Sequence, residues 1–212
     1  MIIKMLTVGE FASNNYLIIC EKTKEAALID AGGDFEATMR EIDESHATLK
    51  YIFYTHAHFD HISGDYELKK KTHAKTYMHI DDKFLADKFK EQLMMFGVKH
   101  IESPVIDEYV KDRQILTVGD LNFEVIHTPG HSPGSVCYFI DKTLFAGDTL
   151  FADSVGRTDL PGGSYDQLRD SVINRLFVLD DEVKVYPGHG GATTIGYEKE
   201  KNPFFGRKAE VK

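Results

Sequence analysis

Cysteine is scarce in this sequence: of 212 residues, only Cys20 and Cys137 carry a thiol. Both lie within apolar alternating segments, so we expect two buried, unpaired thiols rather than a disulfide bond or a thiolate ligand. Any metal that this chain binds must therefore be held by nitrogen and oxygen atoms.

Long apolar runs are also missing, as are low-complexity tracts and linker-like stretches. Residues Met1 to Lys4 begin a strand-like segment and lack the charged and apolar regions of a signal peptide. We therefore expect neither a membrane span nor a secretory leader, and a soluble cytoplasmic protein. A chain of this length and apolar content can bury one substantial core, so we expect residues 1–212 to form a single domain.

Positive charge is in deficit, because 25 lysine and arginine residues face 34 aspartate and glutamate residues, a formal net charge of −9. This balance opposes general attraction to nucleic acid or to anionic lipid. We expect no nucleic-acid or membrane partner, and a small molecule is favoured instead.

Hydrophobic periodicity divides the chain into two halves, in each of which strands are followed by a helix. We expect strands at residues 1–8, 15–20, 26–29, 49–54, 74–79, 115–116, 122–127, 136–140, 144–146 and 183–186. We expect helices at residues 35–45, 64–68, 83–100 and 164–180. Two similar halves indicate an α/β fold with two sheets face to face and helices outside. The segment 83–100 is predicted to pack on the body as an amphipathic helix, and the alternative is a partly mobile lid over the site.

A cluster of metal-binding side chains directly follows the expected strand at 49–54. The stretch Thr55 to His61 reads Thr-His-Ala-His-Phe-Asp-His, and so places three imidazoles and a carboxylate in six positions. Such a cluster is rare by chance, and its position at a strand exit is where α/β folds bind ligands. We therefore predict a metal site built on His56, His58, Asp60 and His61.

Three further donors follow strands of the second half: His131, Asp148 and His189. Each of them alone is weak evidence, because Pro-Gly-His and Gly-Asp-Thr are also ordinary turn sequences. They gain weight through the first cluster and through neighbouring glycines, which let the backbone approach a ligand closely. For four of the other histidines we expect surface or packing roles: His46, His73, His79 and His100. His127, four residues before His131, is expected to be a structural neighbour, and the alternative is that it supports a metal ligand. Asp30 is equally well explained as a helix cap or as a residue that supports the site.

The motifs at residues 55–61, 128–131, 147–149 and 187–189 resemble those of the metallo-β-lactamase superfamily in order and spacing. The resemblance implies a four-layer αββα sandwich with two divalent metal ions at one edge. It implies that one metal is held by His56, His58 and His131, the other by Asp60, His61 and His189. It further implies that Asp148 bridges both metals, which would be zinc, or else iron or manganese.

Within that superfamily, residues 154–163 and the tail from Thr193 to Phe204 are similar to the short prokaryotic form of glyoxalase II. The longer enzymes of that group carry a C-terminal helical domain that binds glutathione, and about twenty residues follow His189 here. The resemblance implies hydrolysis of thioesters like S-lactoylglutathione by a metal-bridged hydroxide, which Asp60 and Asp148 would orient. Arg157 would hold a carboxylate of the substrate.

Three other functions are considered for this sequence. Persulfide dioxygenases share a Gly-Arg-Thr-Asp stretch similar to residues 156–159, and use one iron and molecular oxygen. A non-catalytic metal-binding module is disfavoured, because seven donors exceed the four that a structural zinc requires. RNA-processing relatives are a distant third, given the acidic charge balance.

Overall fold

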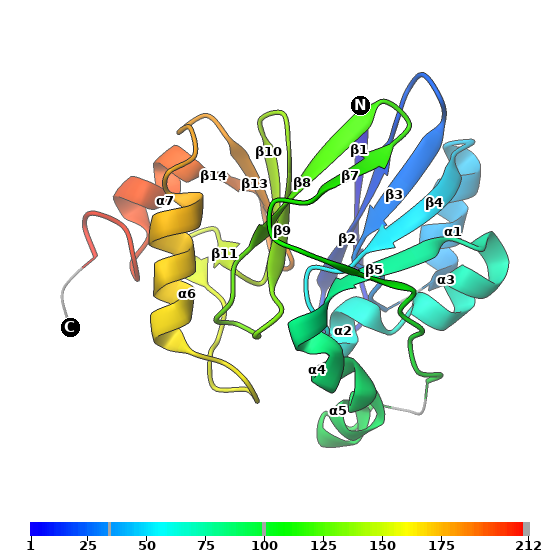
Figure 1. The fold of residues 1–212 in the computed structure, drawn as a ribbon, viewed down its shortest axis with the longest axis horizontal. Coiled ribbons are helices and arrows are strands. Elements are labelled where there is room, and N and C mark those ends of the chain that lie inside the picture. The colour runs from blue at the N-terminus through cyan, green and yellow to red at the C-terminus, as the bar shows by residue number, and fades with distance from the viewer. Residues whose placement is uncertain (34, 99–100, 210–212) are drawn as a thin grey trace.

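The computed structural model describes residues 1–33, 35–98 and 101–209. Two six-stranded sheets pack face to face, and helices cover their outer faces (Figure 1). The four-layer αββα arrangement expected from the sequence is confirmed. Within the described part of the chain, no helix is long and apolar enough to span a membrane.

The first sheet is built from the first half of the chain and has the strand order β1-β2-β3-β4-β5-β6. Its first three strands pair in antiparallel fashion, and the later neighbours pair in parallel. The strands are β1 (Ile2–Val8), β2 (Ser13–Ile19), β3 (Glu25–Ile29), β4 (Thr48–Phe53), β5 (Lys75–His79) and β6 (Glu108–Val110).

The second sheet has the order β14-β13-β10-β9-β8-β7, and its strands pair in antiparallel fashion except for β10 with β13. Its strands are β7 (Ile115–Val118), β8 (Leu121–His127), β9 (Val136–Ile140), β10 (Thr143–Gly147), β13 (Lys184–Pro187) and β14 (Thr193–Thr194). A small hairpin beside it consists of β11 (Leu150–Phe151) and β12 (Ser154–Val155).

Helices form the two outer layers. Those on the side of the first sheet are α1 (Phe35–Glu44), α2 (Phe59–Ile62), α3 (Asp65–Thr72), α4 (Lys83–Asp87) and α5 (Phe89–Met95). Those beside the second sheet are α6 (Tyr165–Ser171) and α7 (Ile195–Lys201). Two shorter turns complete the helical parts, a 3-10 helix (Ile80–Asp82) and a π-helical turn (Val172–Leu176).

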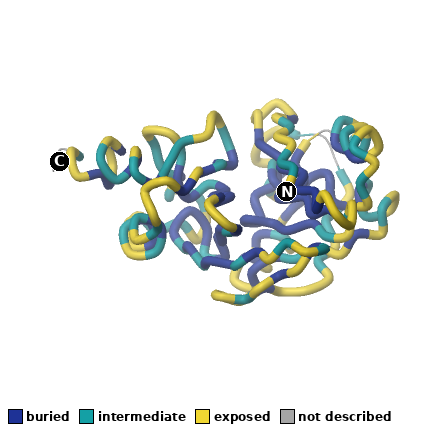
Figure 2. Tube along the Cα trace, turned by 90° about the horizontal axis from the view of Figure 1, so that it is seen from above, coloured by how far each residue is buried: buried dark blue, intermediate teal, exposed yellow. Residues whose placement is uncertain are grey.

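An aromatic layer fills the space between the sheets. Phe53 of β4 stacks on Tyr138 of β9 with ring centroids 5.4 Å apart, and meets the edge of Phe123 of β8 at 5.6 Å. All three side chains are buried, and the Tyr138 hydroxyl donates to the backbone carbonyl of Tyr54 at 2.8 Å. Figure 2 shows buried residues along the strands and exposed ones on the outer helices and loops. This packing fixes the two sheets against each other at the edge where β4 ends.

The helix predicted at 83–100 is wrong as a single element, because the chain forms α4 and α5 with a break at Lys88. At the break, the Gln92 side chain donates to the Leu85 carbonyl at 2.8 Å, and the Lys88 N–H donates to the same oxygen at 3.1 Å. In a continuous α-helix, the Leu85 carbonyl would instead accept the backbone N–H of Phe89. Residues 99 and 100, and with them the surface role expected for His100, lie outside the described residues.

The helix predicted at 164–180 is shorter than expected and passes from α6 into the π-helical turn. Strand β6, the hairpin β11–β12, strand β14 and helix α7 have no counterpart among the expected elements. The two cysteines are free and buried, as predicted.

The aromatic layer yields a stability prediction. Phe53→Ala removes a ring that contacts both sheets, and we expect the free energy of unfolding to fall by about 3–5 kcal/mol. Urea denaturation measures this loss. Ile115→Ala, at a side chain 55% exposed, serves as the control with a change below about 0.5 kcal/mol. A loss below about 1 kcal/mol for Phe53→Ala would contradict tight packing in this layer.

Candidate metal centre

The structure brings all seven predicted donor side chains together at one edge of the sandwich. The loop after β4 carries His56 and His58, the short helix α2 that follows it carries Asp60 and His61, and the loops after β8, β10 and β13 carry one donor each. The crowding explains the glycine before His189, because a Cβ atom on Gly188 would lie 2.1 Å from Oδ1 of Asp148. The strand exits therefore converge as the sequence predicted, although only one donor set lies close together in sequence.

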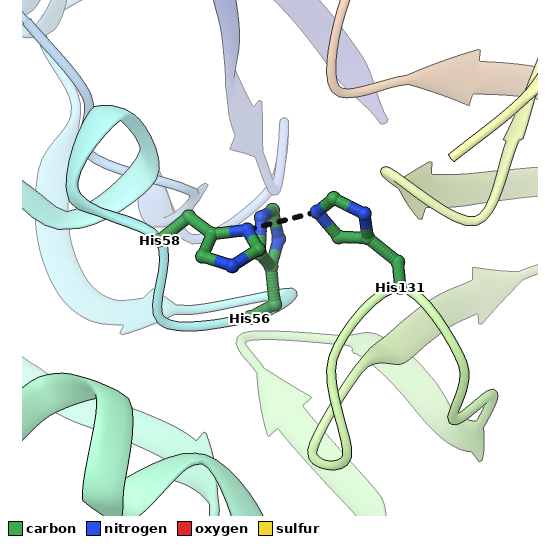
Figure 3. A group of neighbouring side chains, drawn as sticks. All are labelled: His56, His58 and His131. Carbon is green, nitrogen blue, oxygen red and sulfur yellow. Dashed lines mark hydrogen bonds between the residues drawn. The ribbon is translucent and has the colours of Figure 1, made fainter. Parts of the chain in front are cut away.

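Three imidazoles form the first group: His56, His58 and His131 (Figure 3). His56 and His58 come from the loop after β4, whereas His131 reaches in from the loop after β8. Nδ1 of His58 lies 2.9 Å from Nε2 of His131, and the centroids of the His56 and His131 rings are 4.7 Å apart. The two sheets thus contribute jointly to this group.

The second group consists of Asp60, His61 and His189. Nε2 of His61 lies 3.2 Å from Nε2 of His189, and Oδ2 of Asp60 lies 3.4 Å and 3.3 Å from these two nitrogens. Ligand atoms around a tetrahedral zinc ion are separated by about 3.3–3.5 Å, given metal–ligand distances near 2.0–2.1 Å. The spacing of these three atoms fits one cation.

Asp148 lies between the two groups. One carboxylate oxygen is 3.5 Å from Nε2 of His61. The other oxygen is 3.6 Å from Nε2 of His131 and 3.5 Å from Nε2 of His189. A single carboxylate can therefore reach donors of both groups, as a residue that bridges two metals must.

The buried atoms without partners test whether this donor set suits a metal. Nε2 of His56, Nε2 of His58 and Oδ1 of Asp148 are buried and have no hydrogen-bond partner among the described residues. Buried polar atoms are normally paired, because an unpaired one costs about 1–3 kcal/mol. Cations satisfy several such lone pairs at once, so the residues present fit a divalent metal centre.

The charges of the two groups differ. Burial, together with the neighbouring imidazoles, holds the pKa of His56 well below its usual range and lowers that of His58 to about 3. These imidazoles are therefore neutral and keep a lone pair for a ligand. Burial would also lower the pKa of His61, yet the carboxylates of Asp60, Asp148 and Asp30 raise it to about 10. The second group thus attracts positive charge.

Asp30 supports the segment after β4 that carries the first four donors, which decides between its two predicted roles. Its Oδ1 accepts the backbone N–H of Thr55 at 2.8 Å, and its Oδ2 accepts the Thr55 hydroxyl at 2.8 Å. The same Oδ2 accepts from Nδ1 of His61 at 2.9 Å, which leaves Nε2 of that ring facing the other donors. A carboxylate behind a ligating histidine fixes its tautomer and its orientation.

Asp82 is a supporting residue that the sequence did not single out. Its carboxylate accepts the Ala57 N–H at 2.9 Å, the Ser132 hydroxyl at 2.7 Å and the Gly134 N–H at 2.6 Å. It thereby joins the loop of His56 and His58 to the loop of His131, and it is fully buried. The available signal was its place after the strand at 74–79, another strand exit on the same edge.

Arg157 lies at the rim, where its two parts do different things. Its carbonyl accepts from Nδ1 of His131 at 2.8 Å, and so orients that ring. Its exposed guanidinium makes two contacts of 2.7 Å with the carboxylate of Asp159. The side chain lines the cleft, but a partner already engages it.

His127 does not join the seven donors. Its Nε2 donates to the Pro133 carbonyl at 2.9 Å, and its ring stacks on His79 with centroids 4.1 Å apart. Parallel stacked rings cannot direct their in-plane lone pairs at one ion, so this pair serves packing. The packing roles expected for both residues agree with these contacts.

Residues 8–189 match the model of the metallo-beta-lactamase superfamily. The chain belongs to this superfamily. Hydrolases are among its members, and the fold binds divalent metal ions. The hydroxyacylglutathione hydrolase GloC of Haemophilus influenzae is 37% identical over 213 residues, which cover 99% of this chain and 100% of that protein.

Solved structures agree with this assignment. The BLEG-1 B3 metallo-beta-lactamase is 36% identical, with a TM-score of 0.90, over 96% of this chain and 99% of that one. TTHA1623 in a di-iron-bound form is 33% identical, with a TM-score of 0.86, over 95% and 99%. ETHE1 from Myxococcus xanthus is 32% identical, with a TM-score of 0.83, over 97% and 84%.

The contacts of Asp82 yield a prediction about metal affinity. Asp82→Asn keeps the shape of the side chain but leaves one acceptor oxygen for three donors, so the two loops lose a connection. We expect metal affinity to fall about 10- to 100-fold, as for other residues that orient ligands. Competition with a chromogenic chelator measures the affinity.

Asp81→Asn is the matched control, because the Asp81 side chain is about half exposed, at 53%. We expect its metal affinity to stay within twofold of the unaltered protein. Equal losses in both variants would show that charge near the site, and not the connection made by Asp82, sets the affinity.

Proposed function

We propose that this protein is a binuclear metal-dependent hydrolase of thioesters, of the glyoxalase II type. The observation that carries the proposal is the pair of adjoining donor groups with Asp148 between them. The similarity to the hydroxyacylglutathione hydrolase of Haemophilus influenzae supports thioesters as the substrate class. S-lactoylglutathione-like compounds are the first candidates.

In this proposal His56, His58 and His131 would hold one cation and Asp60, His61 and His189 the other, with Asp148 shared. Two bound divalent cations would supply a water of lowered pKa as nucleophile and a positive charge beside the attacked carbonyl. Zinc is our first choice, and the di-iron form of TTHA1623 supports iron as the alternative, with manganese also compatible.

The chain's own residues would position the reactants. Oδ2 of Asp60 accepts the Ser13 hydroxyl at 3.0 Å, which fixes the carboxylate so that it can orient a water molecule between the two groups. The half-open cleft beside the donors is lined by His58, Asp148, Arg157 and His189, and gives a substrate access to them. A thiol leaving group needs no strong general acid, because its pKa of about 8.5 makes the thiolate stable near neutral pH.

A persulfide dioxygenase with one iron is the second candidate. The stretch Gly156 to Asp159 resembles that group, and the similarity to ETHE1 favours the same reading. The two functions differ in metal content and in oxygen consumption. Metal analysis, a thioester hydrolysis assay and an oxygen electrode, applied to one sample, separate them.

We expect two metal equivalents per chain and hydrolysis of S-lactoylglutathione without oxygen uptake. One iron per chain, with oxygen consumed on glutathione persulfide, would replace the proposal by the second candidate. A metal-loaded protein that hydrolyses no thioester, ester or lactam and consumes no oxygen on glutathione persulfide would contradict both and indicate a non-catalytic module.

His58→Ala tests the donor assignment. Loss of one imidazole from the first group should reduce bound metal by about one equivalent and lower kcat by at least about 10³-fold, while the far-ultraviolet circular dichroism stays unchanged. His46→Asn is the control, because His46 is exposed and its positive φ of 51° suits asparagine. Full turnover by a metal-free His58→Ala protein would refute the metal-dependent mechanism.

A further inference from the structure

Three phenyl rings stand together beside the metal centre and form what we call the aromatic wall: Phe11, Phe59 and Phe96. Phe59 meets the edge of Phe11 at 4.9 Å and lies 4.9 Å from Phe96, and the Phe11 and Phe96 centroids are 5.9 Å apart. The rings come from the β1–β2 loop, from α2 and from the end of α5. They are distant in sequence, so their meeting is a property of the fold.

The aromatic wall lines the same cleft as the donor side chains. This cleft measures about 260 Å³, and the three rings share it with His58, Asp60 and His189. Phe59 directly precedes Asp60 in the chain. A group bound against the rings is therefore adjacent to the atoms that would act on a substrate.

Two of the rings keep much of their surface in contact with solvent. Phe11 is 40% exposed and Phe96 is 37% exposed, whereas Phe59 is buried beneath them. A second pocket of about 230 Å³ extends from Phe11 and Phe59 towards Val8. Clustered, exposed apolar side chains at the mouth of a cleft mark a surface that a ligand covers.

The other side of the cleft comes from the second half of the chain and is mostly polar, with His131, Asp148, Arg157 and His189 beside one apolar residue, Leu160. Among the described residues that line the cleft, Arg157 is the single lysine or arginine. The two walls therefore suit different halves of one substrate, an apolar half and a polar half.

We propose that the aromatic wall binds an apolar acyl group of the thioester, while the thiol carrier lies towards Arg157. This inference rests on the proposed thioester hydrolysis and names the acyl groups that the site prefers. Chains of four to six carbons or an aryl-substituted acyl group would cover the exposed rings. The small, hydroxylated lactoyl group would leave them in water.

The test is a series of thioesters that differ only in the acyl group: acetyl, lactoyl, butanoyl and hexanoyl. Each is prepared on N-acetylcysteamine and on glutathione, and kcat/KM is measured with the metal-loaded protein. We expect kcat/KM to rise about three- to fourfold per methylene group that reaches the rings, with the same slope on both carriers.

Removal of a ring should weaken the dependence of kcat/KM on acyl chain length. Phe11→Ala and Phe96→Ala are expected to lower kcat/KM about five- to tenfold more for the hexanoyl than for the acetyl thioester, mainly through KM. Leucine at either position should restore part of the slope, because it returns apolar area without the ring. Phe204→Ala is the matched control, since Phe204 is 47% exposed and does not line the cleft; its slope should not change.

The outcomes separate this inference from the proposed function. Hydrolysis at equal rates along the acyl series, or equal losses on all substrates in the ring variants, would overturn the acyl preference and leave thioester hydrolysis standing. If kcat/KM changed with the thiol carrier and not with the acyl group, the carrier and not the acyl group would lie against the rings. No hydrolysis of any member by the metal-loaded protein would refute the proposed function itself.

Discussion

The structure depends on one constraint: it buries many nitrogen and oxygen donor atoms close together at one edge of the two sheets. Five imidazoles and two carboxylates share this point, and some of their atoms lack any hydrogen-bond partner in the described part of the chain. Such an arrangement opposes folding on its own, because each unpaired buried atom costs free energy. The remainder of the fold must supply rigidity, which the aromatic layer around Phe53 and the carboxylates of Asp30 and Asp82 provide.

The strands and their exits were predictable because they depend on local patterns. Alternation along residues 136–140 and the apolar run at 49–54 each indicate a strand whatever the remainder of the chain does. The break at Lys88 was not predictable, because it depends on the Gln92 side chain, which donates to Leu85 and also to Ala57 in another loop. Hydrophobic periodicity indicates which face of a helix is apolar. It contains no information on a side-chain hydrogen bond that interrupts the helix.

The same division applies to the site. The sequence indicated all seven donors, because imidazoles and carboxylates at strand exits are conspicuous, and the structure places them side by side. The role of Asp82 was not predictable, since it depends on three hydrogen bonds to residues that lie 25 to 52 positions away in the sequence. Arg157 illustrates the converse: the family resemblance implies that it holds a carboxylate of the substrate, whereas the carboxylate of Asp159, two residues on, already engages the guanidinium.

Under the proposed function, different parts of the chain would determine the reaction and the substrate specificity. The donors sit at the ends of strands, whose backbone is fixed by the sheets, and so their geometry tolerates little change. The aromatic wall and the Arg157 rim come from a turn, a helix end and a loop, which can vary in sequence without disturbing the sheets. Phe59 belongs to both parts, as neighbour of Asp60 and as base of the aromatic wall. If the aromatic wall binds the acyl group as proposed, Phe59 would couple the choice of acyl group to the position of the reacting carbonyl.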